Sequence, residues 1–566
     1  MGESFNNFRE KVKEDANKLK EDLVDMVNHI KEKGPEVIKN TIDNFINNLL
    51  DGISKKIHDD EIDYGRGNFN SVKLALNDMN YRKILKKKIY WKDFNNSPIS
   101  EFIKKLPKVD LHCHLGGCAR TQDLIEIAKV FPKNQDMIDK IEDFFTFYDD
   151  HNIKEFFRQN PKKIAQNIYS IENLEEIKAL HYANIIQYLV DKNLVHLLEC
   201  IYEIQDNSGK IINLSHKGQP TKWFSGIGLK QYLNLGAWAG STLLQNSAAI
   251  NKAIECLCNF GRQHNLKYLE LRFNPLSYSR EDLRPEDVYK IVKNAILKHR
   301  GDIIINIIFI ANKPKGVDDL DLKKYKIKML ELVMLIEKIT ENQDDLKYDF
   351  KPRIVGFDIA GLEEFFHKNI HYGFTNIISS TRNDIFSLFS KKIFITIHSG
   401  ETDIKENPFK PRLIIPFIDA VIQLGADRLG HALNISEQFF HKIKRKNITI
   451  ELCPSSNCQI STFLKVPWVE YNENEKNQEN LKNYPLEKYL KHNLIVTVNT
   501  DDPGISKTNW TKELFLASAL SNNPLEISDI IRLIYNGLES SFLLDFEKQH
   551  LIRIFDKEIK DLLIEF

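Results

Sequence analysis

Histidines and acidic residues stand where four separate apolar runs of this sequence stop. His112 and His114 follow VDL and lie two residues apart, so in a strand both imidazoles point to the same face and can bind one cation. The other runs end in groups of the same kind, and these are His398 with Glu401, His431, and the pair Asp501-Asp502. We interpret the four groups together as one candidate site.

Three imidazoles and a carboxylate make a ligand set that suits zinc and leaves one position for water. The ion lowers the pKa of that water to roughly 7, so that hydroxide is available at neutral pH. A neighbouring histidine can orient the water and take its proton, and a carboxylic acid can protonate the electrophile. The pattern therefore predicts hydrolytic chemistry. The run GFDIAG contains no lysine that could be carboxylated to bridge two ions, which favours one metal ion over two.

Each of these residues also has a purely structural interpretation. A histidine at a strand end can be a hydrogen-bonded core group, Glu401 a surface carboxylate, and Asp501-Asp502 part of a turn. A thiolate metal site is a weaker alternative, because neither CLC at Cys256 nor CPSSNC at Cys453 has the spacing of a zinc site. Seven cysteines without a compact framework are typical of reduced thiols in a cytosolic protein.

Short β-rich runs that alternate with long helical stretches follow from about residue 105, which is typical of βα units and a parallel sheet. The eight candidate strands are KVDLHCH, LKYLELRF, DIIINIIFIA, RIVGFDIAG, KIFITIHSG, ADRLGHA, NITIELCPSS and LIVTVNTDD. Eight such units predict an α/β fold of the (β/α)8 TIM-barrel type, in which polar residues at the carboxyl ends of the strands converge on one mouth.

The chain divides into three expected parts. Residues 1–60 show apolar positions at helical intervals with a break at Gly34-Pro35, which predicts a helical hairpin extension. Residues 61–104 are expected to form a linker and a pre-barrel segment, and residues 105–566 the barrel. An insertion at about 131–240 holds a helical lid and an added β-hairpin around Asn207-Ser208-Gly209, and helices occupy about 510–566. The extension or the insertion is expected to make a homo-oligomer.

Charge and hydropathy exclude several classes of function. Lys plus Arg equals Asp plus Glu at 79 each, so no global excess of positive charge favours nucleic acid as the main partner. The longest apolar runs, such as IIINIIFIA, fall far short of the roughly 20 residues that span a bilayer. The N-terminus lacks the apolar core of a secretory signal. We therefore expect a cytoplasmic protein with no membrane partner.

The motifs LHCHLGG, GFDIAG, IHSGE, RLGHA, ELCPSSN and NTDDP resemble, in this order, those of the adenosine deaminase family, within the metal-dependent adenosine/AMP deaminase superfamily. The resemblance implies one zinc ion per subunit with His112, His114, His398 and Asp501 as ligands. It implies that Glu401 protonates adenine N1, that His431 orients and deprotonates the water, that Asp502 bonds N7, and that the Gly361 amide bonds N3. The reaction implied is attack on C6 of an adenine with loss of ammonia.

One position departs from the family pattern. Gly116 stands where the family has an aspartate that contacts the ribose 5′-hydroxyl and would repel a 5′-phosphate. Glycine leaves room and exposed backbone N–H groups there, so we expect a nucleotide substrate such as AMP, dAMP, ATP or dATP. The alternative is free adenosine or deoxyadenosine, with the lost hydrogen bond made by water or another group. Leu362 also stands where the family often has an aspartate.

The insertion supplies further candidates for substrate contact. The segment DFFTFYDDHNIKEFFRQNPKK looks like the family's helical lid, with Phe145 or Phe147 as an apolar wall for the purine. Candidates for phosphate contact, which are alternatively solvated surface charges, are Arg120, Arg158, Lys162 and Lys163.

Two other functions remain open on the sequence. The barrel could be a catalytically silent scaffold or ligand sensor, since fold alone does not guarantee activity. The intact set of Glu401, His431 and Asp502 argues against that. The substrate could also be an N6-substituted purine nucleotide. Enlarged prokaryotic members of the family occur in antiviral systems, and this chain is compatible with such a use.

Overall fold

The computed structural model places 1–70 and 71–566 in two compact units. The residues that it describes are 81–95, 97–147, 161–173, 176–201, 204–205, 211–212, 229, 232–233, 236–279, 283–312, 319–340, 350–361, 394–401, 426–433, 435–460 and 484–566. The expected helical hairpin at 1–60 and the linker that follows it to residue 80 lie outside them.

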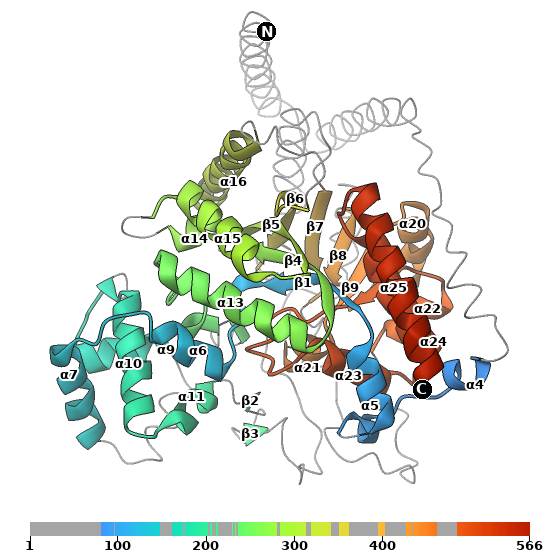
Figure 1. Cartoon of the computed structure of the whole chain (residues 1–566). Coiled ribbons are helices and arrows are strands. Elements are labelled where there is room, and N and C mark those ends of the chain that lie inside the picture. Colours follow the sequence, from blue (N-terminus) through green and yellow to red (C-terminus); the bar gives the residue numbers. More distant parts are fainter. Residues whose placement is uncertain are drawn as a thin grey trace, which may run out of the picture. The chain divides into compact units, whose positions relative to one another are not determined.

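Eight parallel strands form the centre of the second unit (Figure 1). They are β1 (Lys108–His114), β4 (Leu266–Phe273), β5 (Ile304–Asn312), β6 (Ile354–Ala360), β7 (Phe394–Ser399), β8 (Arg428–His431), β9 (Thr449–Leu452) and β10 (Val496–Val498). Each strand pairs in parallel with the next, so that chain order is also spatial order. This confirms the predicted barrel.

The seam between the first and the last strand is closed just beyond β10. Cys113 and Asp501 form a parallel bridge. The Asp501 N–H donates to the His112 carbonyl at 2.8 Å, and the His114 N–H donates to the Asp501 carbonyl at 2.9 Å. The bridge therefore places a carboxylate next to the two histidines of β1, at the carboxyl ends of the strands.

The strands form where the sequence has near-continuous apolar runs because both faces of a barrel strand are covered. All the residues of β6 are buried, and so are all but the last of β5. Helices lie between the strands and include α13 (Ser247–Gln263), α14 (Pro275–Tyr278), α15 (Pro285–His299), α16 (Asp319–Thr340), α20 (Phe440–Arg445), α21 (Pro454–Ile460) and α22 (Leu486–Lys491). Asn246 caps α13 by accepting from the Ala249 N–H, which satisfies one of its free amides.

Short helices precede the barrel, and three longer ones complete it. Helices α4 (Arg82–Leu85) and α5 (Pro98–Lys105) come before β1. Helices α23 (Trp510–Leu520), α24 (Ile527–Ser540) and α25 (Asp545–Glu565) occupy the C-terminal region where helices were expected, and α24 contacts both β1 and β10. Over the residues described, no helix is both long enough and apolar enough to span a membrane.

The chain between β1 and β4 carries the inserted structure. It contains α6 (Thr121–Ala128), α7 (Gln135–Thr146), α9 (Pro161–Tyr169), α10 (Ala179–Asp191) and α11 (Val195–Ile201). Helix α10 packs on both α6 and α7. A two-stranded antiparallel pair, β2 (Ile204–Gln205) and β3 (Ile211–Ile212), lies where the sequence predicts a β-hairpin. Within the residues described between β1 and β4, the insertion thus consists mainly of helices, together with this short antiparallel pair.

Candidate active site

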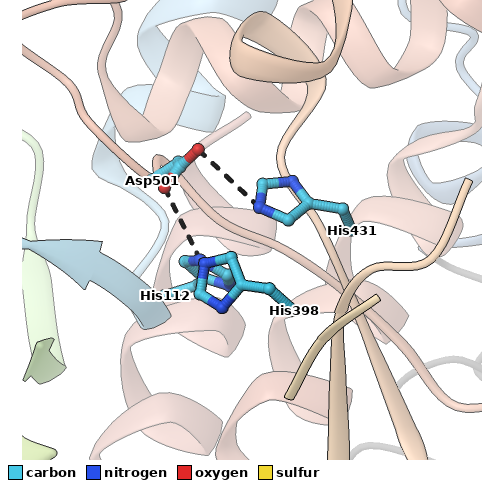
Figure 2. A group of neighbouring side chains, drawn as sticks. All are labelled: His112, His398, His431 and Asp501. Atoms are coloured by element: carbon cyan, nitrogen blue, oxygen red, sulfur yellow. Dashed lines mark hydrogen bonds and ion pairs between the residues drawn. The ribbon is translucent and has the colours of Figure 1, made fainter. Parts of the chain in front are cut away.

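Three imidazole nitrogens meet at the carboxyl end of the barrel. His112 Nε2 lies 3.1 Å from His114 Nε2 and 2.9 Å from His398 Nε2, and the last two atoms are 3.3 Å apart. Asp501 Oδ1 lies 3.3 Å from His114 Nε2 and 3.5 Å from His112 Nε2. Figure 2 shows Asp501 facing His112 and His431, with His398 beside His112. Residues from β1, from β7 and from the segment just beyond β10 thus place four ligand atoms around one point.

These distances fit one metal ion. Ligand atoms about 2.0–2.1 Å from a tetrahedral zinc ion lie about 3.3 Å from one another.

Burial, and then the positive charge of Arg272, lowers the pKa of His112 well below its ordinary value. Burial also lowers the pKa of His114, with a further contribution from His398. Neutral imidazoles offer a lone pair, so the donor set suits a divalent cation.

Two buried carboxylates orient two of these rings from behind. His112 Nδ1 lies 2.9 Å from Glu451 Oε2, and His398 Nδ1 lies 3.1 Å from Asp358 Oδ2. A carboxylate accepts the Nδ1 hydrogen, which leaves the lone pair on Nε2 and directs it at the cluster. Arg272 holds both carboxylates, with one amino group 3.1 Å from Asp358 and the other 2.6 Å from Glu451.

The carboxylate of Asp358 is kept ionised by its neighbours. Burial by itself would raise the pKa of Asp358, but its interactions with His398 and Arg272 together outweigh it, so the pKa lies below its ordinary value. Sequence reasoning missed the supporting residues Arg272, Asp358 and Glu451. A signal was present for two of them, because Asp358 and Glu451 are the only charged residues of their strands and are fully buried.

Replacing Asp358 by asparagine is expected to weaken zinc binding about 10–100-fold. Both oxygens of the Asp358 carboxylate accept hydrogen bonds, and the NH2 group of asparagine would place a donor where one of them now accepts. Thr396 Oγ1 donates to Asp358 Oδ1 at 2.8 Å, and Arg272 donates to Oδ2. Zinc titration against a competing chelator measures the affinity. An unchanged affinity in a folded variant would show that Asp358 does not orient His398.

Two further polar groups lie beside the cluster, Glu401 just after β7 and His431 at the end of β8. His431, fully buried at the end of β8, has its Nε2 atom 3.5 Å from Glu401 Oε1 and 3.9 Å from Asp501 Oδ2. The backbones of His431 and Asp501 both have a φ of +61°, which is rare for residues with a side chain. Such conformations persist where the surrounding structure fixes them, and they are common at functional sites.

A cavity of about 380 Å³ opens from the cluster. One end is lined by His114, His398, Glu401, Asp501 and Asp502. The apolar lining comes from Leu229, Tyr232, Leu233, Phe273, Ile310 and Ile505. The lining also includes small and polar residues, here called the polar recess, namely Gly116, Gly240, Ser241, Thr242, Asn274, Ser277 and Tyr278. The cavity is thus lined by the His/Asp cluster, by a buried acid and by the polar recess. Its volume suits a small ligand.

Comparison with known proteins shows which family the chain belongs to. Residues 221–558 match the family model described as "Adenosine deaminase", and this is more than half of the chain. The chain belongs to the adenosine deaminase family. It is therefore a hydrolase that acts on C–N bonds, as its sequence motifs imply. A cluster of histidine and aspartate that can hold a metal ion is present at the place where those motifs predict it.

Individual relatives extend over most of the chain. An adenosine deaminase of Shewanella halifaxensis is 25% identical over 454 residues, which cover 79% of this chain and 98% of the relative. An adenosine deaminase of Clostridium kluyveri is 24% identical over 452 residues, which cover 78% and 92%. Among solved structures, the N6-methyl-AMP deaminase of Arabidopsis thaliana is 16% identical with a TM-score of 0.49, covering 81% of this chain and 98% of its own.

The adenosine deaminase motifs are brought together in space, but the expected lid residues are not. Glu401, Asp502, Gly361 and Gly116 line the cavity with the cluster residues. Phe147 is 84% exposed, and Phe145 packs on Phe144 and Tyr188; neither is among the residues that line the cavity. Phe145 faces Tyr188 of α10 and Phe147 faces solvent. The apolar wall of the cavity is formed by other residues, such as Tyr232 and Ile505.

The candidate phosphate contacts are only partly within the described residues. Arg120 donates to both carboxylate oxygens of Asp123 at 2.7 and 2.9 Å and lies over the ring of Phe260, so it is used locally and does not line the cavity. Arg158 and the side chains of Lys162 and Lys163 lie outside the described part of the chain. The polar recess at Gly116 is instead formed by hydroxyl, amide and backbone groups.

The second glycine of LHCHLGG has a role that sequence reasoning missed. A Cβ atom on Gly117 would lie 1.8 Å from Asp502 Oδ1, so the Asp502 carboxyl occupies the space that a side chain would need. Burial, and then the charge of Asp501, raises the pKa of Asp502 well above its ordinary value. Gly117 therefore allows a buried acid to stand beside the metal cluster in this deaminase.

Substituting Gly117 by alanine is expected to lower kcat/KM about 10²-fold, because the new methyl group displaces the Asp502 carboxyl. Steady-state rates, zinc content and the far-ultraviolet circular dichroism spectrum of the variant measure this. A folded, zinc-loaded variant within twofold of the parent would contradict the placement of Asp502 in the reaction.

Proposed function

We propose that this protein is a zinc-dependent deaminase that hydrolyses the C6 amino group of an adenine nucleotide, releasing ammonia and the inosine form. The observation that carries the proposal is the single cavity that joins the cluster, with Glu401 beside it, to the polar recess at Gly116. The adenosine deaminase family supplies the reaction class, and the recess supports the nucleotide.

Four residues are proposed to hold the ion, namely His112, His114, His398 and Asp501. When bound, the ion supplies a water molecule of lowered pKa that can attack at neutral pH. Glu451 and Asp358 keep two of the imidazole rings aimed at the ion. Arg272 balances the charge of these two carboxylates within the dry interior of the barrel.

The purine is proposed to be held by groups that line the cavity. Asp502, with its raised pKa, is a carboxylic acid that can donate a hydrogen bond to N7. Gly361, with a φ of +120°, offers its backbone amide to N3. Glu401 delivers a proton to N1, which makes C6 electrophilic, while His431 orients the attacking water. Hydrolysis adds water across the C6–N1 bond; the proton of the C6 hydroxyl then passes to the amino nitrogen, and the C6–N bond to the amino group breaks to leave a C6 carbonyl and release ammonia.

The polar recess favours a phosphate over a bare hydroxyl. Gly116 lies close to Tyr278, because an added Cβ would approach Tyr278 Oη to 3.2 Å, so any side chain at position 116 would take up the room between the two residues. The residues described around it include Ser241, Thr242 and Ser277, which can donate hydroxyl hydrogen bonds to phosphate oxygens. A carboxylate at this position would repel the phosphate, and here it is absent.

Deamination of AMP, dAMP, ATP, dATP, adenosine and deoxyadenosine by the zinc-loaded protein tests the proposal. We expect higher kcat/KM for the phosphorylated forms, and we expect Gly116→Asp to reduce it at least about tenfold for these forms only. Gly116→Asn is the matched control, because it adds the same bulk without the charge. A preference of the parent for free nucleosides would overturn the nucleotide assignment. Absence of turnover on all six would overturn the adenine substrate.

Oligomerisation through the extension or the insertion, and a role in antiviral defence, stay predictions from the sequence.

A further inference from the structure

Asn457 is a fully buried residue of α21 whose amide contacts the fourth histidine of the site. Its Nδ2 atom lies 2.9 Å from His431 Nδ1. Its Oδ1 atom accepts from the Cys453 backbone N–H at 3.1 Å and from the Tyr484 hydroxyl at 3.2 Å. The motif ELCPSSN brings it there, because the chain turns directly from β9 into α21.

These contacts fix which end of the amide faces His431. A backbone N–H can only donate, so the group that faces Cys453 has to be the carbonyl oxygen of Asn457. Burial raises the pKa of Tyr484 well above its ordinary value, so its hydroxyl keeps the hydrogen that it donates to the same oxygen. The NH2 group of Asn457 therefore faces His431 and donates to Nδ1.

The donor on Asn457 decides the tautomer of His431. An Nδ1 atom that accepts a hydrogen bond carries no hydrogen, so the hydrogen of the neutral ring is on Nε2. That Nε2–H is directed toward Glu401 Oε1 and Asp501 Oδ2, at 3.5 and 3.9 Å. A doubly protonated ring would bring its Nδ1–H against the NH2 group of Asn457.

Two other histidines of the site have the opposite tautomer for the same kind of reason. Carboxylates accept the Nδ1 hydrogens of His112 and His398, so their Nε2 atoms offer lone pairs to an ion. An amide takes the equivalent place behind His431 and supplies a hydrogen instead of accepting one. The group bonded to Nδ1 therefore decides whether a ring can bind a metal ion or donate a hydrogen bond through Nε2. This holds although all four rings lie close together.

We propose that Asn457 is a positioning residue that holds His431 with its hydrogen on Nε2, so that His431 donates a hydrogen bond at the reaction centre and neither binds the ion nor accepts a proton there. This differs from the role that the sequence resemblance implies, in which His431 deprotonates the water. The proton lost from the water then passes to a carboxylate, and Glu401 is placed to take it and deliver it to N1. Water still adds in full, with its oxygen on C6 and its proton on N1.

Asn457→Asp gives the sharpest test because it keeps the shape and both acceptor contacts. The new carboxylate can still accept from Cys453 and Tyr484, but it places an acceptor before His431 Nδ1 and so moves the hydrogen from Nε2 to Nδ1. Nitrogen-15 spectra of histidine-labelled protein, with and without zinc, report which nitrogen of His431 carries the hydrogen. The His431→Gln variant assigns the signals among the 17 histidines.

In the parent we expect a protonated Nε2 and a bare Nδ1 on His431, and in Asn457→Asp the reverse. We also expect kcat to fall about 10²–10⁴-fold with little change in KM. Asn259→Asp, the same change on an exposed position of α13, is the matched control and should leave both unchanged.

A parent spectrum with the hydrogen on Nδ1 of His431 would overturn the proposal, and so would an Asn457→Asp variant with unchanged signals and unchanged kcat. If Asn457→Asp fails to fold, the parent spectrum alone decides between the tautomers. The nitrogen signals do not depend on the substrate, so a failed nucleotide assignment leaves this test intact.

Discussion

Replacing Glu401 by glutamine is expected to lower kcat about 10²–10⁴-fold while zinc content stays at that of the parent. The Glu401 side chain is buried at the metal end of the cavity, where it can exchange a proton with N1 of a bound purine. An amide of the same shape cannot carry that proton. Ammonia release and metal analysis on the same preparation measure the two quantities.

Glu142→Gln is the matched control for this substitution. Glu142 is half exposed on α7 and pairs with Lys192 at the surface, so the same change there should leave both rate and zinc content unaltered. A Glu401→Gln enzyme that retains turnover would refute the proton-transfer role. A variant that loses zinc would mean that the carboxyl supports the ion and that its loss of rate has a different cause.

Replacing His112 by alanine is expected to remove zinc and turnover together. His112 Nε2 lies within 3.1 Å of the ligand atoms of both His114 and His398, so the cluster loses its central donor. A ligand that binds only the folded state stabilises it by about 2.7 kcal/mol at a hundredfold excess over its Kd. Zinc should therefore raise the Tm of the parent and leave that of His112→Ala unchanged.

Thermal unfolding with and without added zinc, together with metal analysis, measures this result. His441→Ala is the control, because His441 is exposed on α20 and belongs neither to the cluster nor to the lining of the cavity. Zinc content equal to that of the parent in His112→Ala would show that the ligand assignment is wrong.

The long strands were predictable from short β-rich runs, which are nearly continuous and apolar in β5 and alternate with polar residues in β1 and β4. The runs KVDLHCH and LKYLELRF coincide with β1 and β4 residue for residue. The expected strands at ADRLGHA and LIVTVNTDD are longer than the observed β8 and β10. Both observed strands end near residues with positive φ, His431 and Asp501, where the backbone leaves extended geometry to present a side chain.

The part of the candidate site that consists of histidines and acidic residues at strand ends could be proposed from the sequence. The roles of Gly117 and Asn457 could not, because each depends on a neighbour from another part of the chain, Asp502 and His431 respectively. Phe145, which stays a prediction as a purine wall, is not among the residues that line the cavity. A helix has several faces, and packing of α7 on α10 decided which side chains of the insertion face inward.

The seam between β1 and β10 also determines at which point of synthesis the barrel can close. Thr500 and Asp110, whose side chains share a hydrogen bond there, are 390 residues apart in the chain. All the histidines of the cluster leave the ribosome before Asp501 and Asp502 do. A nascent chain that stops short of β10 lacks Asp501 and the partner that closes β1, so we expect neither the closed barrel nor the full His/Asp cluster before Asp501 has been synthesised.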